Sequence, residues 1–146
     1  MSNFIYKIGF LGPLLLFCIT VYLLWNQMLV YVYVIGLVLN SILNKILKMV
    51  VQQKRPHGKS IMNETYSGIE TYGMPSGHAQ SVFYSITFLY LYGYKSILFL
   101  GITCLTVYQR WKYNNHTLQQ LLIGSFVGIG MAYFIYKQTH ILPLYF

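Results

Sequence analysis

The sequence predicts an all-α protein, a polytopic membrane bundle of about five transmembrane helices, in a single domain over residues 1–146. Two observations support this prediction. Apolar residues make up 56% of the chain and charged residues only 8%, a balance that is typical of membrane proteins. Apolar runs also recur along almost the whole length, each close to the roughly 17–25 residues that a helix needs to cross the hydrocarbon core. The predicted spans are 8–25, 28–50, 77–94, 96–112 and 116–136.

The first span has two possible interpretations. It follows a single lysine, Lys7, so a secretory signal peptide is the alternative to a mature helix. The span is longer than the core of a typical signal peptide, and no small-residue cleavage pattern follows it. We therefore interpret it as a mature helix. Cys18 and Cys104 each fall in the middle of a span, which predicts buried free thiols rather than a disulfide.

The second span carries polar residues near its end. Asn44 and Lys48 are four residues apart, which places them on one face of a helix. Arg55 follows about two turns after Lys48 and stands directly before Pro56. A helix should end at that point, because proline removes a backbone donor and restricts the residue before it.

The third span opens with the sequence Pro75-Ser76-Gly77-His78. Proline suits the first turn of a helix, and the free backbone N–H groups of that turn can bind an anion. Gly77 leaves the backbone open, because it has no side chain to block the approach of the anion. This segment is therefore predicted to bind a negatively charged group.

The fourth span ends with Arg110, and the fifth span begins with His116. Within the fifth span, Gly124 and Gly128 are four residues apart. This spacing lets a second helix approach closely, and we expect tight helix packing there.

Five spans joined by short turns must alternate in direction. The residues before 8, the segment 51–76 and the segment 111–115 then share one side of the membrane. The polar loop 52–75 lies on this side and holds Glu64 and Glu70, the only acidic residues of the chain. The residues expected to converge here are Lys48, Arg55, Ser76, Gly77, His78, Arg110 and His116.

These residue types fit phosphoryl chemistry. Permanent cations and backbone N–H donors bind phosphoryl oxygens, and two histidines can serve as a nucleophile and a general acid. A metal centre is not expected, because the chain has no aspartate and the cations repel a divalent ion. Taken singly, a lysine or arginine at a span end is more often a snorkelling anchor. His57 and His140 have no such neighbours in the sequence, and no role is assigned to them.

The net charge of +8 also limits the partners. A nucleic-acid-binding protein would show a basic face on a soluble domain. Here the positive residues gather at the ends of the spans instead, so the expected partners are the membrane and an anionic or phosphorylated lipid, not a nucleic acid. The sequence does not indicate an oligomeric state.

Three motifs resemble those of the type 2 phosphatidic acid phosphatase superfamily. Lys48 to Arg55-Pro56 matches the K-x6-R-P motif, residues 75–78 match the P-S-G-H motif, and Arg110 with His116 matches R-x5-H. Two positions depart from the family pattern. Gln109 replaces the usual serine before the arginine, and Gln120 replaces the usual aspartate after the histidine.

The second departure resembles the dolichyldiphosphatase branch. The stretches YGMPSGHAQ at 72–80, HTLQQLLIG at 116–124 and the segment 39–56 are similar to that branch. The resemblance implies a single integral-membrane phosphatase domain with a catalytic core at about 39–136. The implied reaction converts dolichyl or another polyprenyl diphosphate to the monophosphate and phosphate, through a phosphohistidine and without a metal or other cofactor.

The resemblance also implies the roles of the site residues. His116 would be the nucleophile and His78 the acid for the leaving group. The residues that would hold the phosphate are Lys48, Arg55, Ser76, Gly77 and Arg110.

Gln120 lies one helical turn after His116. Its carbonyl oxygen can accept the ring N–H and so fix the tautomer, although it supplies no negative charge. Expelling a phosphate, with a pKa of about 6, is easier than expelling an alkoxide, whose conjugate acid approaches the pKa of water at about 15.7. We therefore hypothesise that the glutamine suits a diphosphate substrate.

Two other functions stay open. One is a broader lipid phosphate monoesterase of the phosphatidate type, and the other is a catalytically inactive membrane scaffold protein. The missing acid favours the scaffold, whereas the intact remaining motifs oppose it.

The resemblance implies the endoplasmic reticulum membrane, a lumenal active site and the N-glycosylation pathway. The positive-inside rule would place the site in the cytoplasm, but most of those charges have a catalytic explanation. Asn63-Glu64-Thr65 fits the N-glycosylation pattern and is expected to be accessible. Asn115-His116-Thr117 fits the same pattern and is expected to stay bare.

Overall fold

The computed structural model describes residues 2–56 and 66–141 and confirms the all-α fold. Residues His57, Asn63 and Glu64, for which predictions were made above, lie outside the described residues. The helices are α1 (Ser2–Leu23), α2 (Leu29–Val51), α3 (Gly77–Leu91), α4 (Ile97–Lys112) and α5 (Leu118–Ile141), with a short 3-10 helix η1 (Gly68–Thr71) in the loop before α3.

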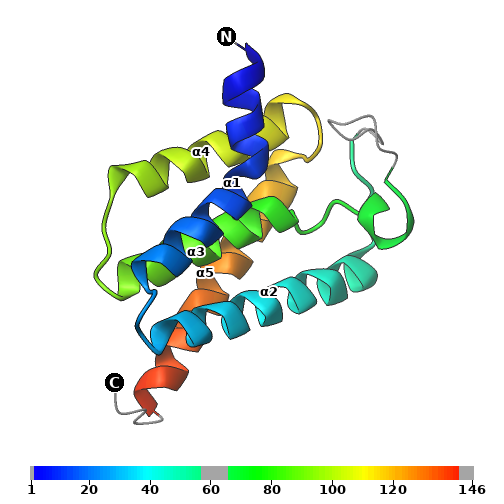
Figure 1. The fold of residues 1–146 in the computed structure, drawn as a ribbon. Helices are drawn as coiled ribbons and strands as arrows, with labels where there is room; N and C mark the ends of the chain where they lie inside the picture. The colour runs from blue at the N-terminus through cyan, green and yellow to red at the C-terminus, as the bar shows by residue number, and fades with distance from the viewer. Residues whose placement is uncertain (1, 57–65, 142–146) are drawn as a thin grey trace.

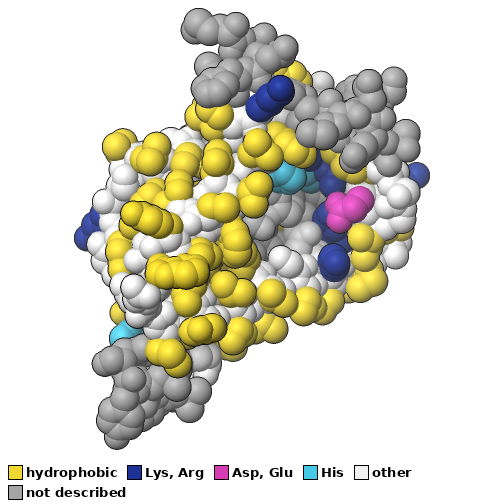
Figure 2. Space-filling model, in the orientation of Figure 1, with side chains coloured by type: hydrophobic (Ala, Val, Ile, Leu, Met, Phe, Trp, Pro, Cys, Tyr) yellow, Lys and Arg dark blue, Asp and Glu magenta, His cyan; other side chains and the backbone are white. Residues whose placement is uncertain are grey.

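The distribution of side chains is that of a protein in lipid. Among the described helices, α2 and the segment Leu118–His140 are long and apolar enough to cross a membrane, with mean hydropathies of 1.7 and 1.6. Large apolar side chains cover the outer surface, whereas many buried residues are polar. Figure 2 shows this apolar covering on one face of the molecule. The bundle is therefore an integral-membrane fold.

Helix α3 lies at the centre of the bundle and packs against α1, α2, α4 and α5 (Figure 1). Its most extensive contact is with α5, where the glycine spacing predicted the close approach of another helix. A Cβ atom on Gly124 would lie 2.6 Å from the carbonyl oxygen of Ser76, and one on Gly128 would collide with the carbonyl oxygen of Gln80. The two glycines thus allow α5 to lie directly against the first turn of α3.

Three sequence predictions need correction. The third span ends at Leu91 rather than at residue 94, because the chain turns at Gly93, whose φ is +88°. Pro75 is not in the first helical turn, since Ser76 is the N-cap and its Oγ accepts a hydrogen bond from the backbone N–H of Ala79 at 3.4 Å. Cys18 and Cys104 are free thiols, but they are exposed on the outer surface of the bundle.

The end of α2 positions Arg55 for the site. The helix stops at Val51, because Gln52 adopts a left-handed conformation with a φ of +51°. The extended chain then pairs with the segment before α3. The backbone N–H of Arg55 donates to Thr71 O at 3.3 Å, and the N–H of Gly73 donates to Gln53 O at 2.7 Å.

Candidate active site

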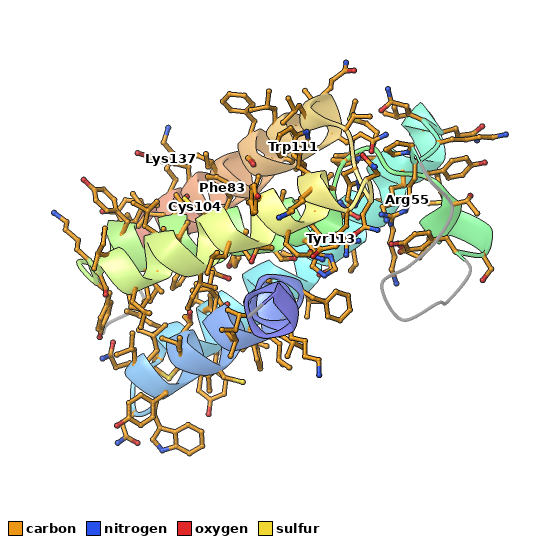
Figure 3. The ribbon with its side chains drawn as sticks, turned by 90° about the horizontal axis from the view of Figure 1, so that it is seen from above. Arg55, Phe83, Cys104, Trp111, Tyr113 and Lys137 are labelled. Atoms are coloured by element: carbon orange, nitrogen blue, oxygen red, sulfur yellow. The ribbon has the colours of Figure 1, made fainter. Side chains whose placement is uncertain are left out.

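The structure brings the ends of α2, α3, α4 and α5 together, as the alternating topology predicted. Lys48, Ser76, Arg110 and His116 are each at most 2% exposed. Figure 3 shows Arg55 at this end of the bundle, opposite the end that carries Lys137. Figure 2 shows Lys and Arg side chains, a histidine and an acidic side chain gathered around one hollow of this face. The residues predicted to form a site therefore lie together, while their predicted roles stay predictions.

The surroundings of His116 define which ring nitrogen carries the proton. Nδ1 lies 3.0 Å from Gly73 O and 3.2 Å from Gln120 Oε1, and both of these atoms can only accept hydrogen bonds. Nε2 lies 2.7 Å from Nη1 of Arg55, which can only donate. The neutral ring therefore carries its proton on Nδ1, and the lone pair of Nε2 faces the cations of the site.

The amide of Gln120 is held in one orientation. Its Nε2 donates to Lys54 O at 3.0 Å and to Gln53 Oε1 at 2.9 Å. Its Oε1 accepts a hydrogen bond from the backbone N–H of Thr117 at 3.2 Å, in addition to that from His116. Because Lys54 O is a backbone acceptor, only this orientation of the amide satisfies the contacts. The oxygen of Gln120 thus faces the histidine, as the sequence predicted.

Burial and charge favour the neutral form of His116, which precedes the first residue of α5. Burial is the largest cause, and the positive charges of Arg55 and Arg110 act in the same direction. Together they lower the pKa of His116 well below its ordinary value. A neutral imidazole has a lone pair available for attack, so this environment suits a nucleophile.

The Glu70 carboxylate binds two of the cations of the site. The Glu70 carboxylate accepts a hydrogen bond from Lys48 Nζ at 2.7 Å and one from Arg55 Nη2 at 3.2 Å. Arg55 Nε also donates to the backbone oxygen of Glu70 at 2.7 Å. Burial opposes the charge of Glu70, but the hydrogen bond and charge of Lys48, together with Arg55, hold its pKa below the ordinary value. Glu70 is therefore ionised at neutral pH.

Aromatic side chains link the remaining cations and His78. The Tyr66 ring lies 3.9 Å from the guanidinium carbon of Arg55, and its hydroxyl accepts a hydrogen bond from Arg110 at 3.2 Å. Phe10 of α1 lies 5.9 Å from the guanidinium carbon of Arg110 and 5.5 Å, between ring centroids, from His78. Helix α1 thus closes the site on the side of His78.

Sequence reasoning missed the second layer of the site. Glu70, Tyr66, Gln53 and Phe10 all contact predicted site residues, yet none belongs to a motif. The one available signal was the polar loop 52–75, which was singled out for its two acids but without a partner for either.

Comparison with known proteins gives a consistent result. The sequence profile of the PAP2 superfamily matches residues 27–142. The chain is 33% identical to Dolichyldiphosphatase 1 of Homo sapiens, over 75% of this chain and 53% of that protein. It is 29% identical to Dolichyldiphosphatase of Saccharomyces cerevisiae, over 82% of this chain and 56% of that protein.

A third relative bears a broader name. The chain is 25% identical to Lipid phosphate phosphatase gamma of Arabidopsis thaliana, over 75% of this chain and 54% of that protein. The chain thus spans about half the length of the curated relatives it matches. No solved structure gives a significant match to the chain.

Proposed function

The chain belongs to the PAP2 superfamily, and from this premise we propose that it is an integral-membrane phosphatase that converts a polyprenyl diphosphate, such as dolichyl diphosphate, to the monophosphate and phosphate. One observation carries the proposal. The Glu70 carboxylate bridges Lys48 and Arg55, and Arg55 also contacts Nε2 of His116. An anion is thus held beside the lone pair of a neutral histidine, which is the arrangement that phosphoryl transfer requires.

In the proposed reaction, the terminal phosphoryl group takes the place of the Glu70 carboxylate between the cations. Nε2 of His116 attacks the phosphorus, and the bond from phosphorus to the bridging oxygen breaks. That oxygen leaves with the lipid monophosphate, and His78 donates a proton to it. Water then attacks the phosphohistidine and gives its proton to His78, which releases phosphate and restores both histidines.

The other predicted residues hold the phosphoryl group. Lys48, Arg55 and Arg110 balance its negative charge, while the backbone N–H of Gly77 and the hydroxyl of Ser76 bind its oxygens at the start of α3. Gln120 keeps the proton of His116 on Nδ1, so that the lone pair for the attack stays on Nε2. These three cations and two histidines account for each step of the reaction without a metal or other cofactor.

We place the protein in the endoplasmic reticulum membrane with this site on the lumenal side. The similarity to two dolichyldiphosphatases supports the choice of membrane, and the lumenal side is what the family resemblance implies. A broader lipid phosphate monoesterase is the second candidate, and it is favoured by the similarity to Lipid phosphate phosphatase gamma.

Phosphate release by the purified protein tests the proposal. Farnesyl diphosphate, farnesyl monophosphate and phosphatidate are offered in detergent, and His116→Ala is assayed in parallel. We expect a higher kcat/KM for the diphosphate and no turnover by the variant. A higher value for phosphatidate would indicate the monoesterase. Equal release by the variant would contradict His116 as the nucleophile, and no release by either protein would indicate an inactive scaffold.

A further inference from the structure

We propose that a cavity between α2 and α3 binds the inner phosphate of a lipid diphosphate, with Lys45 as the cation that recognises it. This inference rests on the proposed function and deepens it, because it identifies the feature that would distinguish a diphosphate from a monophosphate. The cavity has a volume of about 190 Å³ and is lined by Asn40, Ser41, Asn44, Lys45, Glu70 and Gly77, among others.

The cavity adjoins the anion position of the candidate active site. Glu70 lines the cavity and also contacts Lys48 and Arg55, and Gly77 is the first residue of α3. A terminal phosphoryl group that replaced the Glu70 carboxylate would therefore have its next group at the cavity. The volume is several times the roughly 30 Å³ that a water molecule occupies in the liquid, so it has room for a second phosphate.

The polar groups of the cavity are arranged for an anion. Lys45 has an exposed side chain and makes no ion pair within the described part of the chain. Asn40 is 1% exposed, and its Nδ2 has no hydrogen-bond partner among the described residues. Both groups are donors. An ionised oxygen of an inner phosphate in the cavity would pair with Lys45, whereas a monophosphate lipid would place an uncharged ester carbon there.

Neighbouring amides hold the donors in place. Asn44 Nδ2 donates to Gln80 Oε1 at 2.8 Å and to Pro75 O at 3.2 Å. Gln80 Nε2 donates to the backbone oxygen of Asn40 at 2.8 Å and to its Oδ1 at 2.9 Å. Because Asn40 Oδ1 is engaged by Gln80, its Nδ2 is the side of the amide left to donate. The cavity wall is thus fixed before the ligand arrives.

The surface beyond the cavity suits the lipid part of the ligand. Val38, Ile42 and Ile46 are four residues apart along α2, and their side chains are 54%, 48% and 47% exposed. They form an apolar stripe beside Ser41 and Lys45. A prenyl chain that leaves the inner phosphate would lie along this stripe and in the surrounding lipid.

Replacement of Lys45 by glutamine tests the subsite. The side chain is exposed, so Lys45→Gln should fold normally. We expect kcat/KM for farnesyl diphosphate to fall about tenfold, or about 1.4 kcal/mol, because the variant removes the charged partner of the inner phosphate. The kcat/KM for farnesyl monophosphate should change less than about twofold, because this substrate has no inner phosphate for Lys45 to bind. Lys45→Arg should retain the wild-type preference, and Lys112→Gln, which removes an exposed lysine from the end of α4, should leave both values unchanged.

A binding measurement separates this inference from the proposed function. Calorimetry with farnesyl methylenediphosphonate, in which CH₂ replaces the bridging oxygen, requires no turnover. We expect Lys45→Gln to weaken its binding about tenfold, without a change in the affinity for inorganic phosphate. If both ligands weaken equally, or if neither does, the subsite is wrong. If the subsite behaves as expected but the wild-type protein releases no phosphate from farnesyl diphosphate, the proposed hydrolysis fails instead.

Discussion

Oε1 of Gln120 lies 3.2 Å from Nδ1 of His116, and both residues are at most 2% exposed. The glutamine therefore contacts the histidine from the position at which the family pattern has an aspartate, but without the charge of an acid. Gly73 O is a second acceptor for the same proton, at 3.0 Å. The tautomer of the histidine is thus held by two neutral oxygens. We infer that a glutamine can replace the acid at this position because these two oxygens together fix the tautomer.

The first prediction concerns Gln120→Ala. In a serine protease, replacing the orienting acid costs roughly 10⁴-fold in kcat. Gly73 O still accepts the proton from Nδ1 in this variant, so the tautomer should survive. We expect kcat for farnesyl diphosphate to fall about 10–100-fold, the usual range for a residue that supports another. A loss as complete as that of His116→Ala would show that Gln120 has a role beyond orientation.

The second prediction concerns Glu70→Gln. The variant removes the anion that competes with phosphate for Lys48 and Arg55, so the Kd of vanadate or inorganic phosphate should fall about tenfold. It also leaves Lys48, which is 2% exposed, without its ion-pair partner. The melting temperature without ligand should therefore fall, and saturating phosphate should restore it.

The other acidic residue of the loop provides the control for this variant. Glu64→Gln should change neither the phosphate affinity nor the melting temperature. Weaker binding of phosphate by Glu70→Gln would mean that the carboxylate orients the cations for the ligand rather than competing with it.

The third prediction concerns the acid side of the pH profile. Burial and the charges of Arg55 and Arg110 lower the pKa of His116. A histidine with a depressed pKa is neutral, and so able to attack, at every pH above that depressed value. The acid limb of kcat/KM, which reports the free enzyme, should therefore lie below the ordinary histidine pKa of about 6.5. Ionisation of the substrate is titrated separately as a control. An acid limb at or above this pH that substrate ionisation does not explain would contradict the assignment of His116.

Much of the fold was predictable because it depends on local patterns. The apolar runs located five helices, and alternation of direction placed Lys48, Arg110 and His116 at one end of the bundle. The glycine spacing in α5 predicted a close helix contact, and the structure identifies α3 as the partner. Errors arose at helix ends, where Gly93 and Ser76 determine the boundary through backbone conformation and capping rather than through hydropathy.

The remainder of the site was not predictable, because it depends on contacts between residues distant in sequence. Gln53 and Gln120 are 67 residues apart, yet their amides are hydrogen-bonded at 2.9 Å. Glu70 reaches Lys48 only because the chain after α2 pairs with the chain before α3. No periodicity or motif in the sequence encodes this pairing, so the occupant of the anion position became visible only in three dimensions.

Trapping the phosphoenzyme tests the central claim most directly. Farnesyl diphosphate with ³²P in its terminal phosphate is mixed with the protein, and the reaction is stopped with alkali, in which phosphohistidine survives. We expect label on His116 alone, as the isomer substituted at Nε2, because Nδ1 is held by Gly73 and Gln120. His116→Ala should carry no label. A bacterial histidine kinase, labelled in parallel, shows that phosphohistidine survives the procedure. Label at Nδ1 of His116, or turnover without any labelled histidine, would contradict the account.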